Sequence, residues 1–216
     1  MSDTSANPPA ATALPAPPAW KSRRAWMVLL ITAILSLVTD LGSKSLAFRH
    51  VAGTPVHIDR AAVLDTARKD PRLINTLVPN HEPVVVIPKL LHFTLVLNPG
   101  AVFGTGPGKR WFFVGFTIVA LGFGFFMFAR WCTTRDGWAH LGIGLLLGGG
   151  IGNLYDRLVF ACVRDFLHPL PGWRWPGGFT FRGTAEIWPY VSNVADAQLL
   201  VGIGILLVFL WKKDHA

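Results

Sequence analysis

The apolar run at residues 111–129, WFFVGFTIVALGFGFFMFA, places the strongest constraint on the fold. It contains no charged side chain. A helix of this length rises by about 1.5 Å per residue and covers a hydrocarbon core of about 30 Å. Backbone polar groups inside lipid must be satisfied within the segment, which an α-helix achieves. The run therefore predicts a transmembrane helix.

Three further segments resemble it, at residues 24–48, 138–160 and 190–211. The whole chain is 51% hydrophobic and only 15% charged, with a mean hydropathy of +0.43. A soluble domain of 216 residues is not expected to be this apolar. We therefore expect an all-α membrane protein with four transmembrane helices.

Basic residues next to these segments predict the topology. They lie at Lys21–Arg24, in the loop 130–137 and at Lys212–Lys213. With four spans these three flanks share one side, which the positive-inside rule identifies as the cytoplasm. Both termini are then cytoplasmic, and segments 49–110 and 161–189 lie outside. The net charge of +8 is explained by lipid headgroups and topology rather than by nucleic acid.

Residues 1–20 are rich in Pro, Ala, Ser and Thr and predict a disordered tail, followed by a single domain over 21–216. A cleavable secretory signal ending at residues 45–47 is the alternative. The apolar run continues past Asp40 and Lys44 to Phe48, which favours a span. Two strand-like runs, VVVIP at 84–88 and LHFTLVLN at 91–98, predict a small β element in the first outer loop.

Polar residues gather in the outer half of the predicted spans. Counted from the inner ends, Asn153 lies about 22 Å along its helix and Arg157 about 28 Å. Asp40 and Lys44 lie about 24 and 30 Å along theirs. Charge facing lipid is expensive, so these groups are expected to point into the bundle.

Three more polar side chains are predicted at the same leaflet. Asn193 and Asp196 lie within about 10 Å of the outer end of the last span, and Asp165 follows the third span. As an alternative, Asp40–Lys44 or Asp156–Arg157 could be structural ion pairs. Asn153 and Asn193 could form structural hydrogen bonds between helices.

Asp165 and Asp196 remain without a cation partner. Two close carboxylates share a proton, so one can act as general base on a water and the other as general acid. This is the chemistry of aspartic peptidases.

Other chemistries have weaker support. Cys132 and Cys162 are expected on opposite sides of the membrane, which argues against a disulfide, and two cysteines cannot build a metal cluster. No metal or organic cofactor is indicated. A Ser–Lys peptidase using Lys44, a proton-coupled transporter and a noncatalytic scaffold remain alternatives, although a transporter should carry polar groups in both leaflets or at the midplane.

Five motifs, in chain order, resemble those of the lipoprotein signal peptidase (signal peptidase II) family. They are Asp-Leu-Gly-Ser-Lys at 40–44, Asn-Pro-Gly-Ala-Val-Phe-Gly at 98–104, Gly-Gly-Ile-Gly-Asn-Leu-Tyr-Asp-Arg at 149–157, Val-Arg-Asp-Phe at 163–166 and Trp-Pro-Tyr-Val-Ser-Asn-Val-Ala-Asp at 188–196.

The resemblance implies a catalytic dyad of Asp165 and Asp196. It also implies that four residues bind the substrate: Asn98, Asn153, Arg157 and Asn193. Three further residues are implied to support the site: Asp40, Lys44 and Asp156. The implied substrate is a diacylglyceryl-modified bacterial prolipoprotein, cleaved just before its lipidated Cys.

The implied enzyme is a monomer in the cytoplasmic (inner) membrane, with its site at the outer leaflet, in contact with lipid and not with nucleic acid. Segments 51–82 and 168–187 are longer than the family usually has. Arg164 stands beside Asp165 in the chain and, if its side chain approached, would lower the pKa of that carboxyl.

Overall fold

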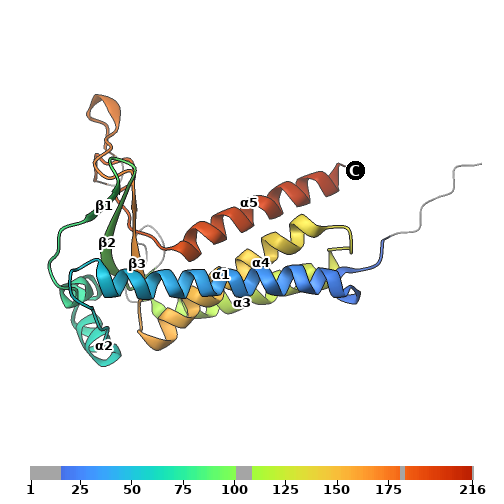
Figure 1. The fold of residues 1–216 in the computed structure, drawn as a ribbon, viewed down its shortest axis with the longest axis horizontal. Coiled ribbons are helices and arrows are strands. Elements are labelled where there is room, and N and C mark those ends of the chain that lie inside the picture. The colour runs from blue at the N-terminus through green and yellow to red at the C-terminus, as the bar shows by residue number, and fades with distance from the viewer. Residues whose placement is uncertain (1–15, 101–108, 181–182, 216) are drawn as a thin grey trace, which may run out of the picture.

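The computed structural model describes residues 16–100, 109–180 and 183–215. Within these ranges, four long helices run side by side and a three-stranded sheet lies across one end of the bundle (Figure 1). The helices are α1 (Arg23–His50), α3 (Arg110–Arg130), α4 (Gly137–Val159) and α5 (Val194–Asp214). The helix α1 begins, and α5 ends, at the end opposite the sheet.

Three of these helices, α1, α3 and α5, are long and apolar enough to cross a membrane. The helix α4 is not among them, because its glycines and the polar residues of its last turns lower its hydropathy. The structure agrees with the predicted class, a mostly helical membrane protein with a small β element. Of the four predicted membrane spans, three correspond to span-capable helices, which are α1, α3 and α5.

The start of the last helix differs from the prediction. The apolar pattern placed it at residue 190, whereas α5 begins at Val194 with Asn193 as its N-cap. The preceding residues are extended, and Ser192 forms a bridge with Leu167 of the sheet. An asparagine cap followed by Asp at the third helical position fixes a helix start more strongly than hydrophobicity does.

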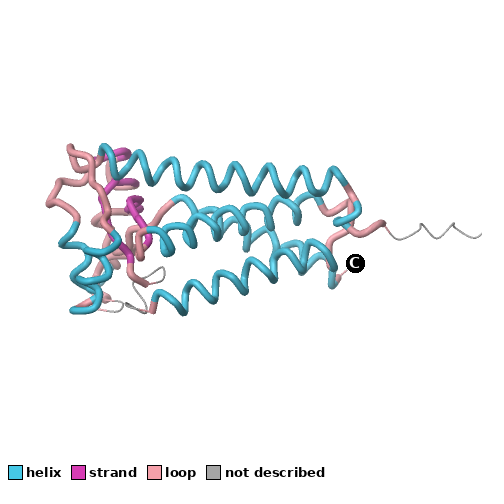
Figure 2. Tube along the Cα trace, turned by 90° about the horizontal axis from the view of Figure 1, so that it is seen from below, coloured by secondary structure: helices cyan, strands magenta, loops and turns pink. Residues whose placement is uncertain are grey.

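The helix α4 is the central helix of the bundle and packs against α1, α3 and α5. Glycine allows this close approach. A Cβ added at Gly148 would overlap the carbonyl oxygen of Ala33 and the side chain of Ser36 on α1. Van der Waals packing between small residues is a main source of helix association in membranes. The tube view in Figure 2 shows the long helices together, with the strands gathered at one end.

The sheet is antiparallel, in the order β1 (Val84–Ile87), β2 (Leu91–Asn98) and β3 (Val163–Pro169). The two strands predicted from the first outer loop are confirmed. The third strand comes from the segment after α4 and pairs Asp165 with Val96. The sheet therefore joins the two segments of the chain that are predicted to lie outside the membrane.

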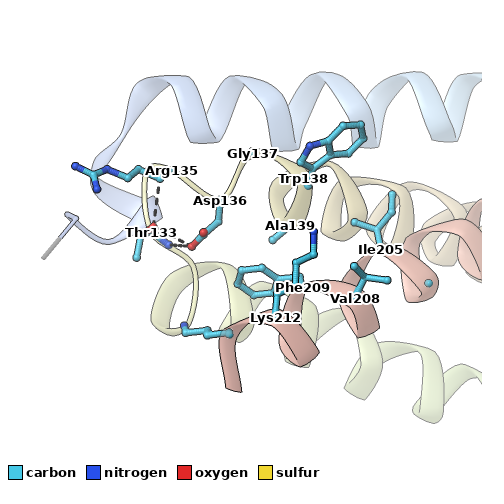
Figure 3. Close-up of a pocket in the computed structure, with 12 residues that line it drawn as sticks. Thr133, Arg135, Asp136, Gly137, Trp138, Ala139, Ile205, Val208, Phe209 and Lys212 are labelled. Atoms are coloured by element: carbon cyan, nitrogen blue, oxygen red, sulfur yellow. Dashed lines mark hydrogen bonds between the residues drawn. The ribbon is translucent and has the colours of Figure 1, made fainter. Parts of the chain in front are cut away.

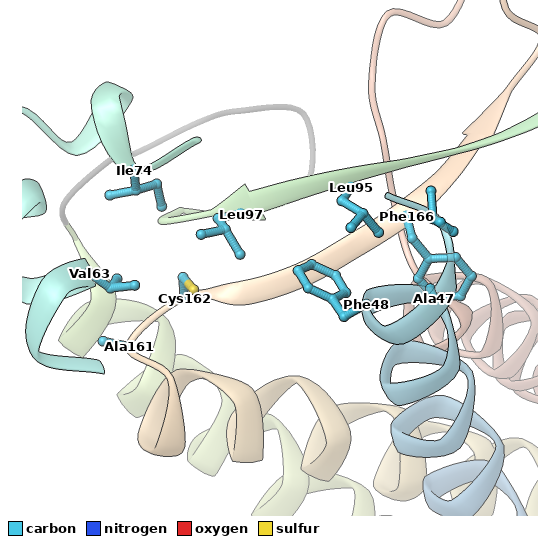
Figure 4. Close-up of a cluster of buried hydrophobic side chains, with 10 residues drawn as sticks. Ala47, Phe48, Val63, Ile74, Leu95, Leu97, Ala161, Cys162 and Phe166 are labelled. Carbon is cyan, nitrogen blue, oxygen red and sulfur yellow. The ribbon is translucent and has the colours of Figure 1, made fainter. Parts of the chain in front are cut away.

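The long insertion at 51–82 forms a small outer layer rather than an open loop. It contains α2 (Arg60–Lys69) and the 3-10 helix η2 (Pro71–Leu77). Val63 and Ile74, from these two elements, are buried with Leu97 of β2 and Cys162, next to β3 (Figure 4). Apolar burial against both strands fixes the outer layer on the sheet.

The prediction of a disordered tail over 1–20 is wrong for residues 16–20. The Ala19 N–H donates to the carbonyl oxygen of Cys132, and the Thr134 N–H donates to that of Pro17. Ala19 is fully buried and begins the short helix η1 (Ala19–Lys21). The α3–α4 loop therefore anchors this stretch, and residues 1–15 lie outside the described residues.

Candidate active site

Asp165 lies on β3 and is 1% exposed. Its Oδ1 accepts a hydrogen bond of 2.6 Å from Asn193 Nδ2, and its Oδ2 accepts one of 3.0 Å from Asn98 Nδ2. Burial, followed by the nearby charge of Asp196, raises the pKa of this carboxyl to about 8. A carboxylic acid in this range can hold a proton at neutral pH.

Asp196 lies in the first turn of α5 and is 7% exposed. Its Oδ2 accepts a hydrogen bond from the backbone N–H of Asn193, at 3.1 Å, which completes a capping box. Its Oδ1 accepts a hydrogen bond of 3.0 Å from Asn153 Nδ2 on α4. Residues from two helices therefore fix the orientation of this carboxylate.

Asn193 connects the two carboxylates. Its Nδ2 donates to Asp165, while its Oδ1 accepts a hydrogen bond of 3.1 Å from the backbone N–H of Asp196. The same Nδ2 lies 3.2 Å from Asn153 Oδ1. One fully buried side chain thus links β3, α4 and α5 at the two predicted carboxylates.

Lys44 lies completely buried beneath this group. Its Nζ donates to Asp40 Oδ2 at 2.8 Å and to Asn153 Oδ1 at 2.9 Å, and it lies 3.5 Å from Asp156 Oδ2. Because the Asn153 oxygen faces the ammonium, its amide nitrogen faces Asp196. The cation therefore fixes both the charge balance and the orientation of that amide.

The main partner of Asp156 is Arg164, not its chain neighbour Arg157. Arg164 Nη2 lies 2.8 Å from Asp156 Oδ1, and the Arg164 backbone N–H donates to Asp156 Oδ2 at 3.0 Å. Arg164 and Asp165 are consecutive in a strand, so their side chains point to opposite faces. The approach of Arg164 to Asp165 that their neighbourhood in the chain suggested does not occur.

Arg157 is 9% exposed, and its guanidinium is held by backbone oxygens. Its Nη1 donates to the carbonyl oxygen of Asn153 at 3.1 Å, and its Nη2 to that of Gly100 at 2.9 Å. It also lies over the ring of Phe113, at 5.6 Å from the centroid. These contacts connect α4 with the chain after β2 and with α3.

A cavity of about 380 Å³ adjoins the two carboxylates. Asp165, Asp196, Asn98, Asn153 and Arg157 line its polar end. Apart from Thr117, its remaining wall is apolar and comes from α3, α4, α5 and β3: Phe112, Phe113, Phe116, Ala120, Leu121, Leu146, Gly150, Val163, Leu199 and Ile203. The arrangement presents two acid–base groups beside a space with a long apolar surface.

All nine site residues predicted from the sequence lie in one connected group. The remainder of the second motif, Ala101 to Gly104, lies outside the described residues. In the described part of the chain, no set of three or more His, Cys, Asp or Glu side chains is placed to hold a metal ion.

Two features of the site were missed by sequence reasoning. One is Arg164 as the partner of Asp156, because they lie eight positions apart across a turn. The other is the bond of 2.7 Å between Ser36 on α1 and Gln198 on α5, next to the carboxylate group. Gln198 is a polar residue in an apolar helix, and that signal could have identified it.

A bundle of long apolar helices, three of them long enough to cross a membrane, indicates a multi-pass membrane protein, and it carries two buried carboxyl groups at one end. A profile described as signal peptidase (SPase) II matches residues 32–212, which include all of these side chains. The chain belongs to the signal peptidase II family, a family of proteases.

Curated relatives agree with this assignment. A lipoprotein signal peptidase of Desulfitobacterium hafniense (strain DSM 10664 / DCB-2) is 37% identical over 135 residues, covering 62% of this chain and 78% of the relative. One of Halothermothrix orenii is 35% identical over 133 residues, with 62% and 79% covered. A solved bacterial membrane enzyme shares the fold, with a TM-score of 0.60 at 22% identity over 87% of this chain and 90% of that one.

Proposed function

We propose that this protein is an aspartic endopeptidase that removes the signal peptide from diacylglyceryl-modified bacterial prolipoproteins. Cleavage takes place just before the lipidated Cys, and Asp165 and Asp196 activate the attacking water. The observation that carries the proposal is the convergence of these two buried carboxyls, one on β3 and one on α5, on Asn193, whose side-chain amide donates to Asp165 and whose backbone N–H donates to Asp196. The curated relatives named above support the choice of substrate.

The two carboxyls divide the acid and base roles. We assign the shared proton to Asp165, whose pKa is raised by burial, and the role of base to Asp196. Asp196 takes a proton from water as the oxygen attacks the scissile carbonyl carbon. Asp165 donates its proton to the carbonyl oxygen. Collapse of the tetrahedral intermediate breaks the C–N bond. The proton taken by Asp196 passes to the leaving amine, and a hydroxyl of the intermediate returns its proton to Asp165 as the new carboxyl forms.

The remaining polar groups hold the substrate and the dyad. Asn98 and Asn193 orient Asp165, and Asn153 orients Asp196. The guanidinium of Arg157 lines the same cavity and has further donors for backbone oxygens of a bound peptide. Asp40, Lys44 and Asp156 lie behind these residues and maintain their orientation.

The apolar wall of the cavity suits the lipid part of the substrate. A diacylglyceryl group needs an apolar surface next to the scissile bond. The cavity provides one from Phe112 and Phe116 on α3 to Leu199 and Ile203 on α5. Burial of an acyl chain contributes about 0.8 kcal/mol per CH₂ group. We infer that this contribution holds the lipidated Cys beside the dyad.

The placement in the membrane is also proposed. The helix α4 has 23 residues, about 34 Å at 1.5 Å per residue, and packs along the three span-capable helices, so we assign it as the fourth span. The basic flanks then place both termini in the cytoplasm. The dyad lies at the outer leaflet of the inner membrane, and residues 21–216 act as one monomeric unit.

The test is a cleavage assay with purified protein and a diacylglyceryl-modified prolipoprotein in detergent. Asp165→Asn and Asp196→Asn should each abolish release of the signal peptide, while both proteins remain folded by circular dichroism. Asp65→Asn on α2, which removes an exposed carboxylate, is the matched control and should cleave as the wild type does. Cleavage by a folded Asp165 or Asp196 variant would contradict the proposed dyad.

A further inference from the structure

A second and larger cavity lies at the opposite end of the bundle from the dyad. Its volume is about 750 Å³, compared with about 380 Å³ for the cavity beside Asp165 and Asp196. It lies between the α3–α4 loop, the first turn of α4 and the last turns of α5 (Figure 3). Asp196 and Lys212 are separated by about 24 Å along α5, so the two sites are distinct.

The wall of this cavity is apolar. Ile205, Val208 and Phe209 of α5 face Trp138 and Ala139 at the start of α4. Gly204 adds no side chain, and a Cβ built there would meet no atom within 4 Å, so the groove continues along α5. Val208 is 54% exposed. The cavity therefore opens onto the apolar outer surface of α5, where lipid chains lie against a transmembrane helix.

The cavity lies at the level along the bundle where a membrane boundary is expected. Trp138 is 75% exposed, and Trp concentrates where hydrocarbon meets headgroups. Lys212 and Lys213 follow the apolar part of α5 at the same level. A molecule in this cavity would therefore have one part among headgroups and one among acyl chains.

The rim of the cavity is positively charged. Arg135, Lys212 and Lys213 line it, together with one carboxylate, Asp136. The Asp136 Oδ2 accepts hydrogen bonds of 2.7 and 2.9 Å from the backbone N–H and hydroxyl of Thr133, so it is directed into its own loop.

The cations of the rim differ in their partners. The Lys213 ammonium donates to the carbonyl oxygen of Trp131. The ammonium of Lys212 has no hydrogen-bond partner among the residues that the structure describes. Among the described residues, none of the three rim cations forms an ion pair with a carboxylate.

We propose that this cavity binds an anionic glycerophospholipid. Its phosphate would lie at Lys212, Lys213 and Arg135, and an acyl chain would follow α5 past Gly204 and Val208. Basic pockets between transmembrane helices at the cytoplasmic side recognise anionic headgroups. The apolar wall favours a lipid over a soluble phosphate, which would leave that wall exposed to water. The proposal does not depend on the identity of the catalytic residues.

Native mass spectrometry of the purified protein, titrated with phosphatidylglycerol or phosphatidylcholine, tests the site. The wild type should bind phosphatidylglycerol at least about tenfold more tightly, because each of the three basic residues contributes on the order of a fivefold change. Lys212→Gln with Lys213→Gln should remove most of this preference, because only Arg135 remains. Gly204→Leu fills the groove and leaves the cations in place, so it should weaken binding of both lipids.

The control removes two basic residues from the outer layer, Arg68→Gln with Arg72→Gln, and should keep the preference. Cleavage of prolipoprotein by every variant verifies that it is folded. Equal affinity of the wild type for the two lipids would overturn the proposal, as would equal loss in the control. Competition by soluble glycerol phosphate at equal concentration would assign the site to free phosphate and also overturn it.

Discussion

Asn193 and Asp196 cap each other at the start of α5. The backbone N–H of each residue donates to the side chain of the other, at 3.1 Å in both directions. A capping box normally satisfies the free N–H groups of a helix start. Here the same box holds Asp196 in place, and the amide nitrogen of Asn193 remains available for Asp165. The start of α5 and the proposed dyad therefore depend on the same two side chains.

Asn193→Ser and Asn193→Ala separate the two roles of this residue. Both remove the amide that donates to Asp165, and a hydrogen bond to a neutral carboxyl contributes about 0.5–1.5 kcal/mol. Both should therefore reduce kcat for prolipoprotein cleavage by about 2- to 10-fold. Serine still caps the helix, so its thermal stability should exceed that of the alanine variant by about 1 kcal/mol. Equal stability of the two variants would contradict a capping role.

The pKa of Asp165, raised to about 8, predicts that cleavage declines as pH rises through about 8. Above that pH the proposed acid has lost its proton and both carboxyls are charged. The rate should fall tenfold per pH unit on the alkaline side. The measurement is kcat/KM from about pH 6 to about pH 10, with circular dichroism at each pH to verify folding. A rate that stays constant to pH 10 would contradict the role of Asp165 as acid.

The same shift predicts an effect on stability. The folded pKa of Asp165 lies above its ordinary value of 3.8, so its contribution to stability is fully present below about pH 3.8 and is lost as pH rises through about 8. Asp165→Asn keeps a neutral group at this position. It should therefore lose less stability than the wild type between pH 6 and pH 9, as measured by thermal unfolding in detergent. Parallel curves for the two proteins would contradict the raised pKa.

The sequence predicted most of the helices because lipid forces each span into an uninterrupted apolar run, as at 111–129. It also predicted the converging residues, since charged side chains in a bundle are expensive unless they meet. It could not predict β3, because strand pairing with β2 depends on contacts far apart in the chain. It could not assign Arg164 to Asp156, since two candidate arginines adjoin the same region and only packing selects between them.

Lys44→Met should destabilise the protein strongly. The change leaves Asp40 and Asp156 buried without their shared cation, and loss of one partner from a buried ion pair costs about 3–5 kcal/mol. Lys69→Met is the matched control, since its pair with Asp65 is 71% and 65% exposed and should contribute less than about 1 kcal/mol. Thermal unfolding in detergent measures both, and similar losses in the two variants would show that burial of the Lys44 group has no special effect.

Gly152→Ala should disturb the site through Asp40. A Cβ at Gly152 would overlap the Asp40 carboxylate, whose Oδ1 accepts the Ala195 N–H and whose Oδ2 accepts Lys44 Nζ. Overpacking of this kind costs about 1–3 kcal/mol, and cleavage should fall because the first turn of α5 carries Asp196. Gly122→Ala on α3, where a Cβ meets open space, should keep both stability and activity. If Gly152→Ala retained wild-type activity, the close contact between α4 and Asp40 would not be required for orientation of the dyad.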